Sequence, residues 1–287
     1  MLIKKLIFDV AITGHHSEYI NHLIDYLLFE VESDSEYYFV VHPEFASTFP
    51  SIYKKAKSIK RLHWKPIKKS ELSKVQSGNK VWGSLMSMDT MNRYAKKFKV
   101  DHVIAIDFHT IKYGFIFYTP PYKLSSILFQ QFHRINRKKR KFEYYKRYFI
   151  TKLVCRNRQV SRIFILNDSE VVKFMNSEFK TNCFQMLPDP IPILEPLEEF
   201  DIYKHYAIEP NRKVFLHLGA LGSRKGTSEV IESVFHLNEQ IRHRVAILLV
   251  GKASSSSEES MFLEQIETVK NKTNVQVYWD NQFVSNK

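Results

Sequence analysis

Short runs of β-branched and aromatic residues alternate along this chain with longer stretches whose apolar residues repeat at helical spacing. Seven short runs are predicted to be strands: 3–12, 37–41, 59–64, 102–107, 127–133, 162–166 and 183–187. Five longer stretches between them are predicted to be helices: 18–30, 44–57, 79–98, 137–157 and 168–177. Because parallel strands need crossover connections that are usually helical, this order predicts an α/β fold with a mainly parallel, helix-covered sheet.

A proline-rich segment then interrupts the pattern. Residues 187–196 hold four prolines, which cannot continue a helix or a central strand. Beyond it the alternation resumes with strands at 213–218, 245–250 and 275–279 and helices at 225–240 and 258–270. We therefore predict a first domain over 1–190, a linker over 191–210 and a partial second domain over 211–287. Three strands and two helices make about half of an open α/β sheet, so the second domain is expected to be incomplete.

Composition excludes several classes of protein. The chain has 287 residues, of which 44% are hydrophobic and 25% charged, so it is neither disordered nor fibrous. Its two cysteines, Cys155 and Cys183, are too few for a disulfide framework or a zinc ribbon and are expected to be small buried apolar residues. The sequence contains no run of 18 apolar residues, and Asp9 interrupts the apolar start that would otherwise resemble a signal peptide. We therefore expect a cytoplasmic protein.

The net charge of +13 is concentrated in two segments. Residues 134–162 hold twelve basic residues and one acid, and residues 54–74 hold nine basic residues and one acid. Phe142, Tyr145 and Phe149 would form one stripe of a helix with cationic flanks. Three interpretations remain open: an anionic membrane surface, nucleic acid as the less favoured partner, or a solvated face whose aromatic residues turn into the core.

Several polar residues follow predicted strands, where open α/β sheets bind ligands. They are the segments Gly14–Ser17, Asp107–His109 and Phe132-His133. The adjacent histidines His15 and His16 diverge, so a turn that leads into a helix is a better interpretation of the first segment than a metal site. A lone histidine is more often structural than catalytic, although here two strand ends each carry one.

The most specific segment is Phe215–Gly226, in which a strand runs into a glycine loop, two cations and a predicted helix. Arg224 and Lys225 would add full charges to the partial positive charge and free N–H groups of a helix N-terminus. Such a loop is suited to hold a diphosphate, although it is neither a Walker A motif nor a G-x-G-x-x-G loop. A plain strand–turn–helix junction with exposed cations is the alternative.

The order of these parts resembles glycosyltransferase family 4, whose members have the GT-B fold of two Rossmann-like domains. The resemblance rests on Gly14, on the segment 127–133 that ends in Phe-His, on Ser161–Glu170, on Leu187–Ile191 and on Gly219–Gly226. It implies transfer of a sugar from a UDP- or GDP-sugar to a glycan or lipid-linked acceptor, as in polysaccharide biosynthesis, with no obligatory metal and no cofactor beyond the donor substrate. Such acceptors would bring the protein to the inner face of a membrane as a peripheral protein.

The resemblance also assigns roles to residues. His133 would lie near the transferred sugar as the catalytic residue, and the donor would be bound by Gly14, Gly219, Arg224, Lys225 and Gly226. Two departures stand out: Ala220 occupies the place of the arginine that usually follows the loop glycine, and the family's two-glutamate segment would lie beyond Lys287. A truncated transferase, inactive as a fragment, is one expectation; a non-catalytic interaction protein and a nucleotide-sugar epimerase are the alternatives.

Overall fold

The computed structural model describes residues 2–13, 16–30, 34–129, 131–188 and 200–282, which divide into two compact units, 1–192 and 193–287. Residues 200–210, which the sequence assigned to the linker, carry the short helix α8 (Ile202–His205). They also hydrogen-bond to the second unit, for example from Tyr278 Oη to the Ala207 carbonyl at 3.0 Å. Part of the predicted linker, 191–199, and Gly14 lie outside the described residues.

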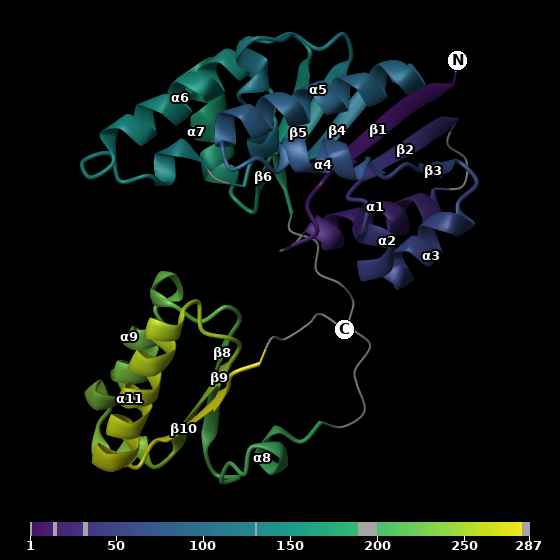
Figure 1. The fold of residues 1–287 in the computed structure, drawn as a ribbon. Coiled ribbons are helices and arrows are strands. Elements are labelled where there is room, and N and C mark those ends of the chain that lie inside the picture. The colour runs from purple at the N-terminus through teal and green to yellow at the C-terminus, as the bar shows by residue number, and fades with distance from the viewer. Residues whose placement is uncertain (1, 14–15, 31–33, 130, 189–199, 283–287) are drawn as a thin grey trace. The chain divides into compact units, whose positions relative to one another are not determined.

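Unit 1 is built on a seven-stranded parallel sheet in the order β3-β2-β1-β4-β5-β6-β7 (Figure 1). The strands are β1 (Ile3–Asp9), β2 (Ser35–Val41), β3 (Leu62–Trp64), β4 (His102–Asp107), β5 (Lys123–Ile127), β6 (Val160–Leu166) and β7 (Phe184–Leu187). The residues of β1 alternate between two cores, since Leu6 and Phe8 face one side and Ile7 faces the other. A sheet with two buried faces is what a parallel arrangement requires.

Each face of this sheet has its own helices (Figure 1). One core includes side chains from α5 (Lys80–Phe98), α6 (Lys141–Cys155) and α7 (Ser169–Phe179), with α4 (Lys69–Val75) on the same side. The other core includes α1 (His16–Phe29), α2 (Phe45–Thr48) and α3 (Pro50–Ser58). The free thiol Cys183 is buried in the first core, with Cys155 packed against it.

The fifth strand is the main correction in unit 1. The prediction placed it at 127–133, but β5 ends at Ile127, and Phe132 and His133 lie in the following 3₁₀ turn η3 (Phe132–Arg134). The pattern missed the strand because β5 buries Ser125 and Ser126, which read as polar. Their hydroxyls are satisfied inside the sheet, by His102 Nε2 at 2.9 Å and by the Ala105 carbonyl at 2.6 Å.

Unit 2 has a three-stranded parallel sheet in the order β10-β9-β8, with strands β8 (Lys213–Leu218), β9 (Val245–Val250) and β10 (Gln276–Asp280). Its core joins β9 and β10 to α9 (Thr227–Glu232) and α11 (Ser256–Lys272). The predicted helix 225–240 is wrong as one element. It consists of η4 (Ser223–Lys225), α9, η5 (Ser233–His236) and α10 (Glu239–Arg242).

Two residues explain why that helix is divided. Gly226 has a left-handed φ of +69°, which separates η4 from α9. Asn238 is the N-cap of α10, where its side chain accepts a hydrogen bond from the Ile241 amide at 2.9 Å. An asparagine at this position starts a new helix more readily than it continues an existing one.

Candidate functional site

The carboxyl ends of β1 and β4 bring together three titratable side chains in unit 1. Asp9 is the last residue of β1, Asp107 is the last residue of β4, and His16 is the first residue of α1. His16 Nδ1 lies 2.9 Å from both carboxylate oxygens of Asp9, whose side chain is only 4% exposed. A proton on Nδ1 that is donated to Asp9 leaves Nε2 as the basic nitrogen of a neutral His16.

Burial and nearby charge have opposite effects on the pKa of His16. Burial lowers the pKa of His16, but the hydrogen bond to Asp9 and the charges of Asp9 and Asp107 outweigh it and raise the pKa above its usual value. The pKa of Asp107 is raised mainly by burial, even though its carboxylate accepts a hydrogen bond from the His109 amide at 2.8 Å. Titratable groups with shifted pKa values at the carboxyl edge of a parallel sheet are typical of functional sites.

A second cluster lies after β4 on the α6 side of the sheet. Lys112 Nζ is 3.0 Å from His109 Nδ1. Burial and the nearby charge of Arg147 lower the pKa of Lys112 to about 8. The sequence singled out His109 but not Lys112, Asp9 or the Asp9–His16 pair. The sequence signal for Asp9 is a carboxylate at the end of the first strand.

His133, predicted as the catalytic residue, does not join the Asp9–His16 pair. It follows Phe132, which is buried in the core on the α6 and α7 side, and its ring lies 6.1 Å from that of Phe174 in α7. His16 lies on the opposite side, at the start of α1, with its ring 6.1 Å from that of Phe129. His133 and His16 therefore lie on opposite sides of the sheet.

In unit 2, the predicted donor loop places Lys225 over the carboxyl end of β8. Lys225 Nζ donates a hydrogen bond to the Leu218 carbonyl at 3.0 Å. A Cβ on Gly219, which has a φ of +115°, would lie 2.5 Å from that nitrogen. The left-handed φ favours glycine here, and the absence of a Cβ leaves room for Lys225 Nζ in this position. Arg224 is exposed beside it, with no carboxylate within 4 Å in the part of the chain that the structure describes.

The backbone of this loop corrects one expectation. The amides of Lys225, Gly226 and Thr227 all bond to carbonyls within the loop, and the Ser223 amide donates to Glu258 Oε1 at 2.8 Å. These N–H groups are not available to a ligand, and α9 is only six residues long. The full positive charges that the loop offers are those of the Arg224 and Lys225 side chains.

Buried contacts hold the loop in shape. Thr227 is fully buried, and its hydroxyl lies 3.0 Å from both the Gly222 amide and His217 Nε2. From the next loop, Ser254 Oγ donates to the Leu221 carbonyl at 2.7 Å. The hydrogen bond from the Ser223 amide also lowers the pKa of Glu258, which therefore stays ionised. The loop is thus preorganised by its own scaffold.

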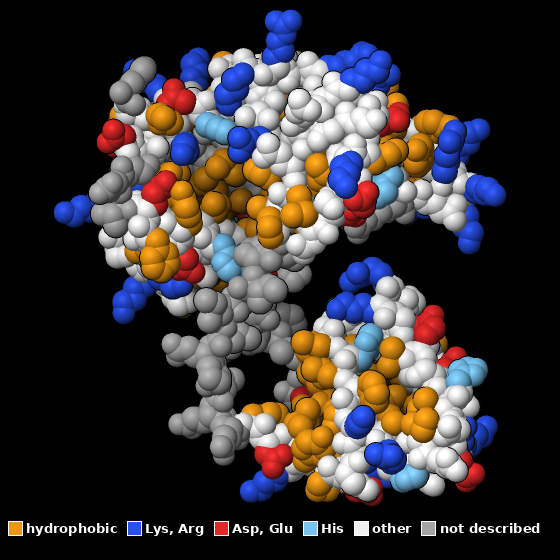
Figure 2. Space-filling view, turned by 180° about the vertical axis from the view of Figure 1, so that it is seen from behind, with side chains coloured by type: hydrophobic (Ala, Val, Ile, Leu, Met, Phe, Trp, Pro, Cys, Tyr) orange, Lys and Arg blue, Asp and Glu red, His pale blue; other side chains and the backbone are white. Residues whose placement is uncertain are grey.

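Most residues of the two basic segments are exposed, and they are distributed over both faces of the sheet of unit 1. Phe142, Tyr145 and Phe149 of α6 are 81%, 41% and 59% exposed, so the interpretation that turned them into the core is wrong. Figure 2 shows Lys and Arg side chains gathered with hydrophobic ones at the end of unit 1 that carries α6. The other segment, 54–74, begins in α3 on the opposite face of the sheet. No helix among the described residues is long and apolar enough to cross a membrane.

Comparison with known proteins identifies the fold. No family model and no curated protein matches the sequence. Among solved structures, WaaG, a glycosyltransferase involved in lipopolysaccharide biosynthesis, matches 96% of this chain and 70% of its own at 14% identity and a TM-score of 0.57. Anabaena Alr3699/HepE, solved with UDP and glucose, matches 99% of this chain and 70% of its own at 13% identity and a TM-score of 0.60.

A putative UDP-N-acetylglucosamine 2-epimerase from Listeria monocytogenes is also similar. The match covers 99% of this chain and 69% of the epimerase, at 12% identity and a TM-score of 0.55. Identities this low demonstrate the fold and leave the activity open. The chain is therefore an α/β protein with Rossmann-like units and the GT-B fold of known glycosyltransferases.

Proposed function

We propose that this chain transfers a sugar, a hexose by the resemblance to family 4, from a UDP- or GDP-sugar to a glycan or lipid-linked acceptor. The observation that carries the proposal is the position of Lys225 over the carboxyl end of β8, held against Gly219 with Arg224 beside it. Similar structures solved with UDP, or with UDP-glucose, support a nucleotide-sugar donor. The assignment to family 4 belongs to the same proposal.

The chemistry needs positive charge where the leaving group forms. As the bond between the sugar and the diphosphate breaks, negative charge grows on the phosphate oxygens, and fixed cations stabilise it without rearrangement. Arg224 and Lys225 supply that charge from a loop that Thr227 and Ser254 hold in place. No metal is needed in this scheme, because two side-chain cations do what a divalent ion would do.

The acceptor would meet unit 1, where two histidines are candidates for the catalytic role. His133 keeps the role that the resemblance implies, next to the transferred sugar. His16 has the chemistry of a general base, since Asp9 binds Nδ1 and leaves Nε2 to take a proton from an acceptor hydroxyl. Separate His133→Ala and His16→Gln variants would assign the role: the catalytic histidine is the one whose loss lowers the turnover rate while nucleotide binding persists.

Nucleotide binding is the direct test of the donor loop. We expect calorimetry to detect binding of UDP or GDP to the unaltered chain. The Lys225→Ala variant should bind the same nucleotide at least about tenfold more weakly, because a charge-assisted hydrogen bond to phosphate contributes about 1.5–3 kcal/mol. Lys213→Ala is the matched control, because Lys213 is an exposed lysine at the other end of β8. Failure of both nucleotides to bind, or equal binding by Lys225→Ala and the unaltered chain, would contradict the proposal.

Two alternatives remain distinguishable from transfer. A nucleotide-sugar epimerase is favoured by the Listeria structure and by the half-buried Asp107 close to His16, which could serve as an acid–base pair. An epimerase would alter a UDP-sugar with no acceptor present, whereas a transferase needs the acceptor. Nucleotide binding without turnover of either kind would favour a non-catalytic interaction protein.

We also propose that α6 binds the anionic inner face of a membrane, where a lipid-linked acceptor would lie. Support comes from the exposed rings of Phe142 and Phe149, flanked by lysines and arginines. Each phenylalanine contributes about 1.5–3 kcal/mol if fully buried, so a Phe142→Ser, Phe149→Ser double variant should bind anionic vesicles at least about tenfold more weakly. Phe29→Ser is the control, because Phe29 is 86% exposed on α1. Equal binding to neutral vesicles would contradict this proposal.

A further inference from the structure

Unit 1 contains a cavity of about 840 Å³ that lies away from the candidate site. Its walls come from residues 85–100, which cover most of α5 and the two residues after it, and from the segment 114–122 that precedes β5. Val100 and Tyr122 line it; Val100 lies two residues before β4 begins, and Tyr122 lies directly before β5. The cavity is thus at the amino-terminal edge of the sheet, whereas Asp9, His16 and Asp107 are at the carboxyl edge.

Apolar side chains form much of the cavity wall, and the polar and charged lining residues include Asp89, Asn92 and Arg93. Leu85, Met88, Val100, Phe117 and Pro121 contribute hydrophobic surface. The backbone at Gly114 approaches α5 so closely that a Cβ there would lie 2.5 Å from the Met88 Cβ. Only glycine allows this contact, so the two walls are held at a defined separation.

The polar groups inside the cavity satisfy one another. The Tyr122 hydroxyl donates a hydrogen bond to Asn92 Oδ1, and both residues line the cavity. Burial raises the pKa of Tyr122, so the phenol stays neutral at physiological pH. The interior therefore offers a ligand hydrophobic contact and few polar groups that need a partner.

The rim of the cavity is cationic. Lys96 and Lys99 lie three residues apart at the end of α5, both are exposed, and both line the cavity. In the described part of the chain neither has a carboxylate within 4 Å, whereas Arg93 is bonded to Glu71 at 2.7 Å and to Asp89 at 3.0 Å. Two lysines without counter-ions at the mouth of an apolar cavity are complementary to a negative charge on an apolar molecule.

We propose that this cavity is a second binding site for an amphipathic anion. The aliphatic or aromatic body of the ligand would lie between Met88 and Phe117, and its carboxylate, sulfonate or phosphate would meet Lys96 and Lys99. The volume lies within the range of about 300–1,000 Å³ of small-molecule sites. This site does not depend on the proposed transferase activity, because no residue of the donor loop or of the Asp9–His16 pair contributes to it.

The test uses 8-anilinonaphthalene-1-sulfonate as a fluorescent probe and dodecanoate as its competitor, with the full chain. Leu85→Trp fills the cavity, and Met86→Trp on the same helix is its control because Met86 does not line the cavity. A Lys96→Glu, Lys99→Glu double variant reverses the charge of the rim, with Lys97→Glu as the control outside it. We expect probe affinity to fall by about tenfold or more in the first variant of each pair and by about twofold or less in the controls.

Competition experiments show which kind of ligand the cavity takes and whether the cavity is separate from the donor site. Displacement by free dodecanoate but not by phosphatidylglycerol vesicles indicates a soluble amphipathic anion, while displacement by both indicates a lipid headgroup at a membrane. UDP should not displace the probe, so a failure of nucleotide binding leaves this result untouched. The proposal is overturned if the filled and charge-reversed variants bind the probe as the unaltered chain does, or if UDP displaces it.

Discussion

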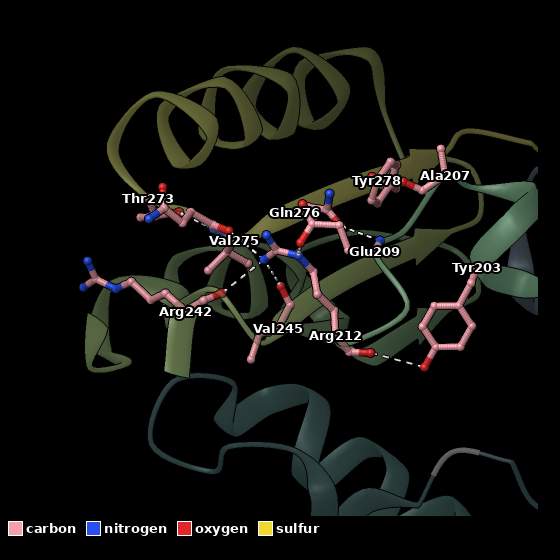
Figure 3. Close-up of polar contacts among 11 residues, drawn as sticks. Tyr203, Ala207, Glu209, Arg212, Arg242, Val245, Thr273, Val275, Gln276 and Tyr278 are labelled. Carbon is pink, nitrogen blue, oxygen red and sulfur yellow. Dashed lines mark hydrogen bonds and ion pairs between the residues drawn. The ribbon is translucent and has the colours of Figure 1, made fainter. Parts of the chain in front are cut away.

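Replacement of Arg212 is expected to destabilise unit 2 by about 3 kcal/mol. The Arg212 side chain is 7% exposed and lies just before β8 (Figure 3). Its Nη1 donates to the carbonyls of Asn274 at 2.7 Å and Val245 at 3.1 Å, with Arg242 further away at 3.4 Å, and its Nε donates to Glu209 at 2.8 Å. One guanidinium therefore joins the segments that enter β8, β9 and β10.

The magnitude follows from those contacts. Nη1 has two hydrogens, so two charge-assisted hydrogen bonds to backbone carbonyls are lost in Arg212→Met, each contributing about 1.5–3 kcal/mol. Part of this is recovered because methionine avoids the desolvation of a buried charge, so we expect a net loss of about 3 kcal/mol. Glu209 is 53% exposed, and Glu209→Gln should cost less than about 1 kcal/mol. Arg212→Lys keeps the charge without the planar fork and should fall between these values.

Hydrogen exchange during urea titration measures this effect separately in each unit. The amides of β9 and β10 report on unit 2, and those of β1 and β4 serve as the internal reference. Arg212→Met should accelerate exchange in β9 and β10 and leave β1 and β4 unchanged. The reasoning is refuted if Arg212→Met costs no more than Glu209→Gln, or if exchange accelerates equally in both units.

Two further predictions concern the edges that carry the candidate site. Gly251 has a φ of +136°, and a Cβ there would overlap the Gly219 carbonyl oxygen, so Gly251→Ala should destabilise unit 2 by more than about 2 kcal/mol in urea unfolding. Gly78→Ala is the control: a Cβ there would have nothing within 4 Å, so the free energy of unfolding should change by less than about 1 kcal/mol. Equal effects of the two substitutions would contradict this prediction. Burial lowers the pKa of His16, but the hydrogen bond to Asp9 and the nearby carboxylates raise that pKa overall. The stabilisation from the Asp9–His16 pair is therefore present below about pH 6.5 and is lost as pH rises through the folded-state pKa of His16. The difference in unfolding free energy between the unaltered chain and Asp9→Asn should therefore shrink from about pH 5.5 to about pH 8.5, and a difference that grows would be inconsistent with the pairing.

Local sequence was sufficient for strands that are rich in apolar and β-branched residues. The bounds of 102–107, 213–218 and 245–250 agree with β4, β8 and β9. Local sequence gave the wrong bounds where the pattern of polar and apolar residues is ambiguous. The buried serines of β5 satisfy their hydroxyls only through neighbouring strands, and the helix after the donor loop is divided by Gly226 and Asn238 within a sequence of otherwise helical periodicity.

The sequence by itself determined the order of strands and helices, the glycine loop with its two cations, and the presence of an aromatic stripe within a basic segment. Only the tertiary structure decided that Asp9, His16 and Asp107 meet, because β1 and β4 are neighbours in the sheet although about a hundred residues separate them. It also decided that the stripe faces outward and that Lys225 lies against the end of β8. Periodicity along one chain describes the faces of each element, whereas these contacts depend on which other elements pack against them, and that information is non-local.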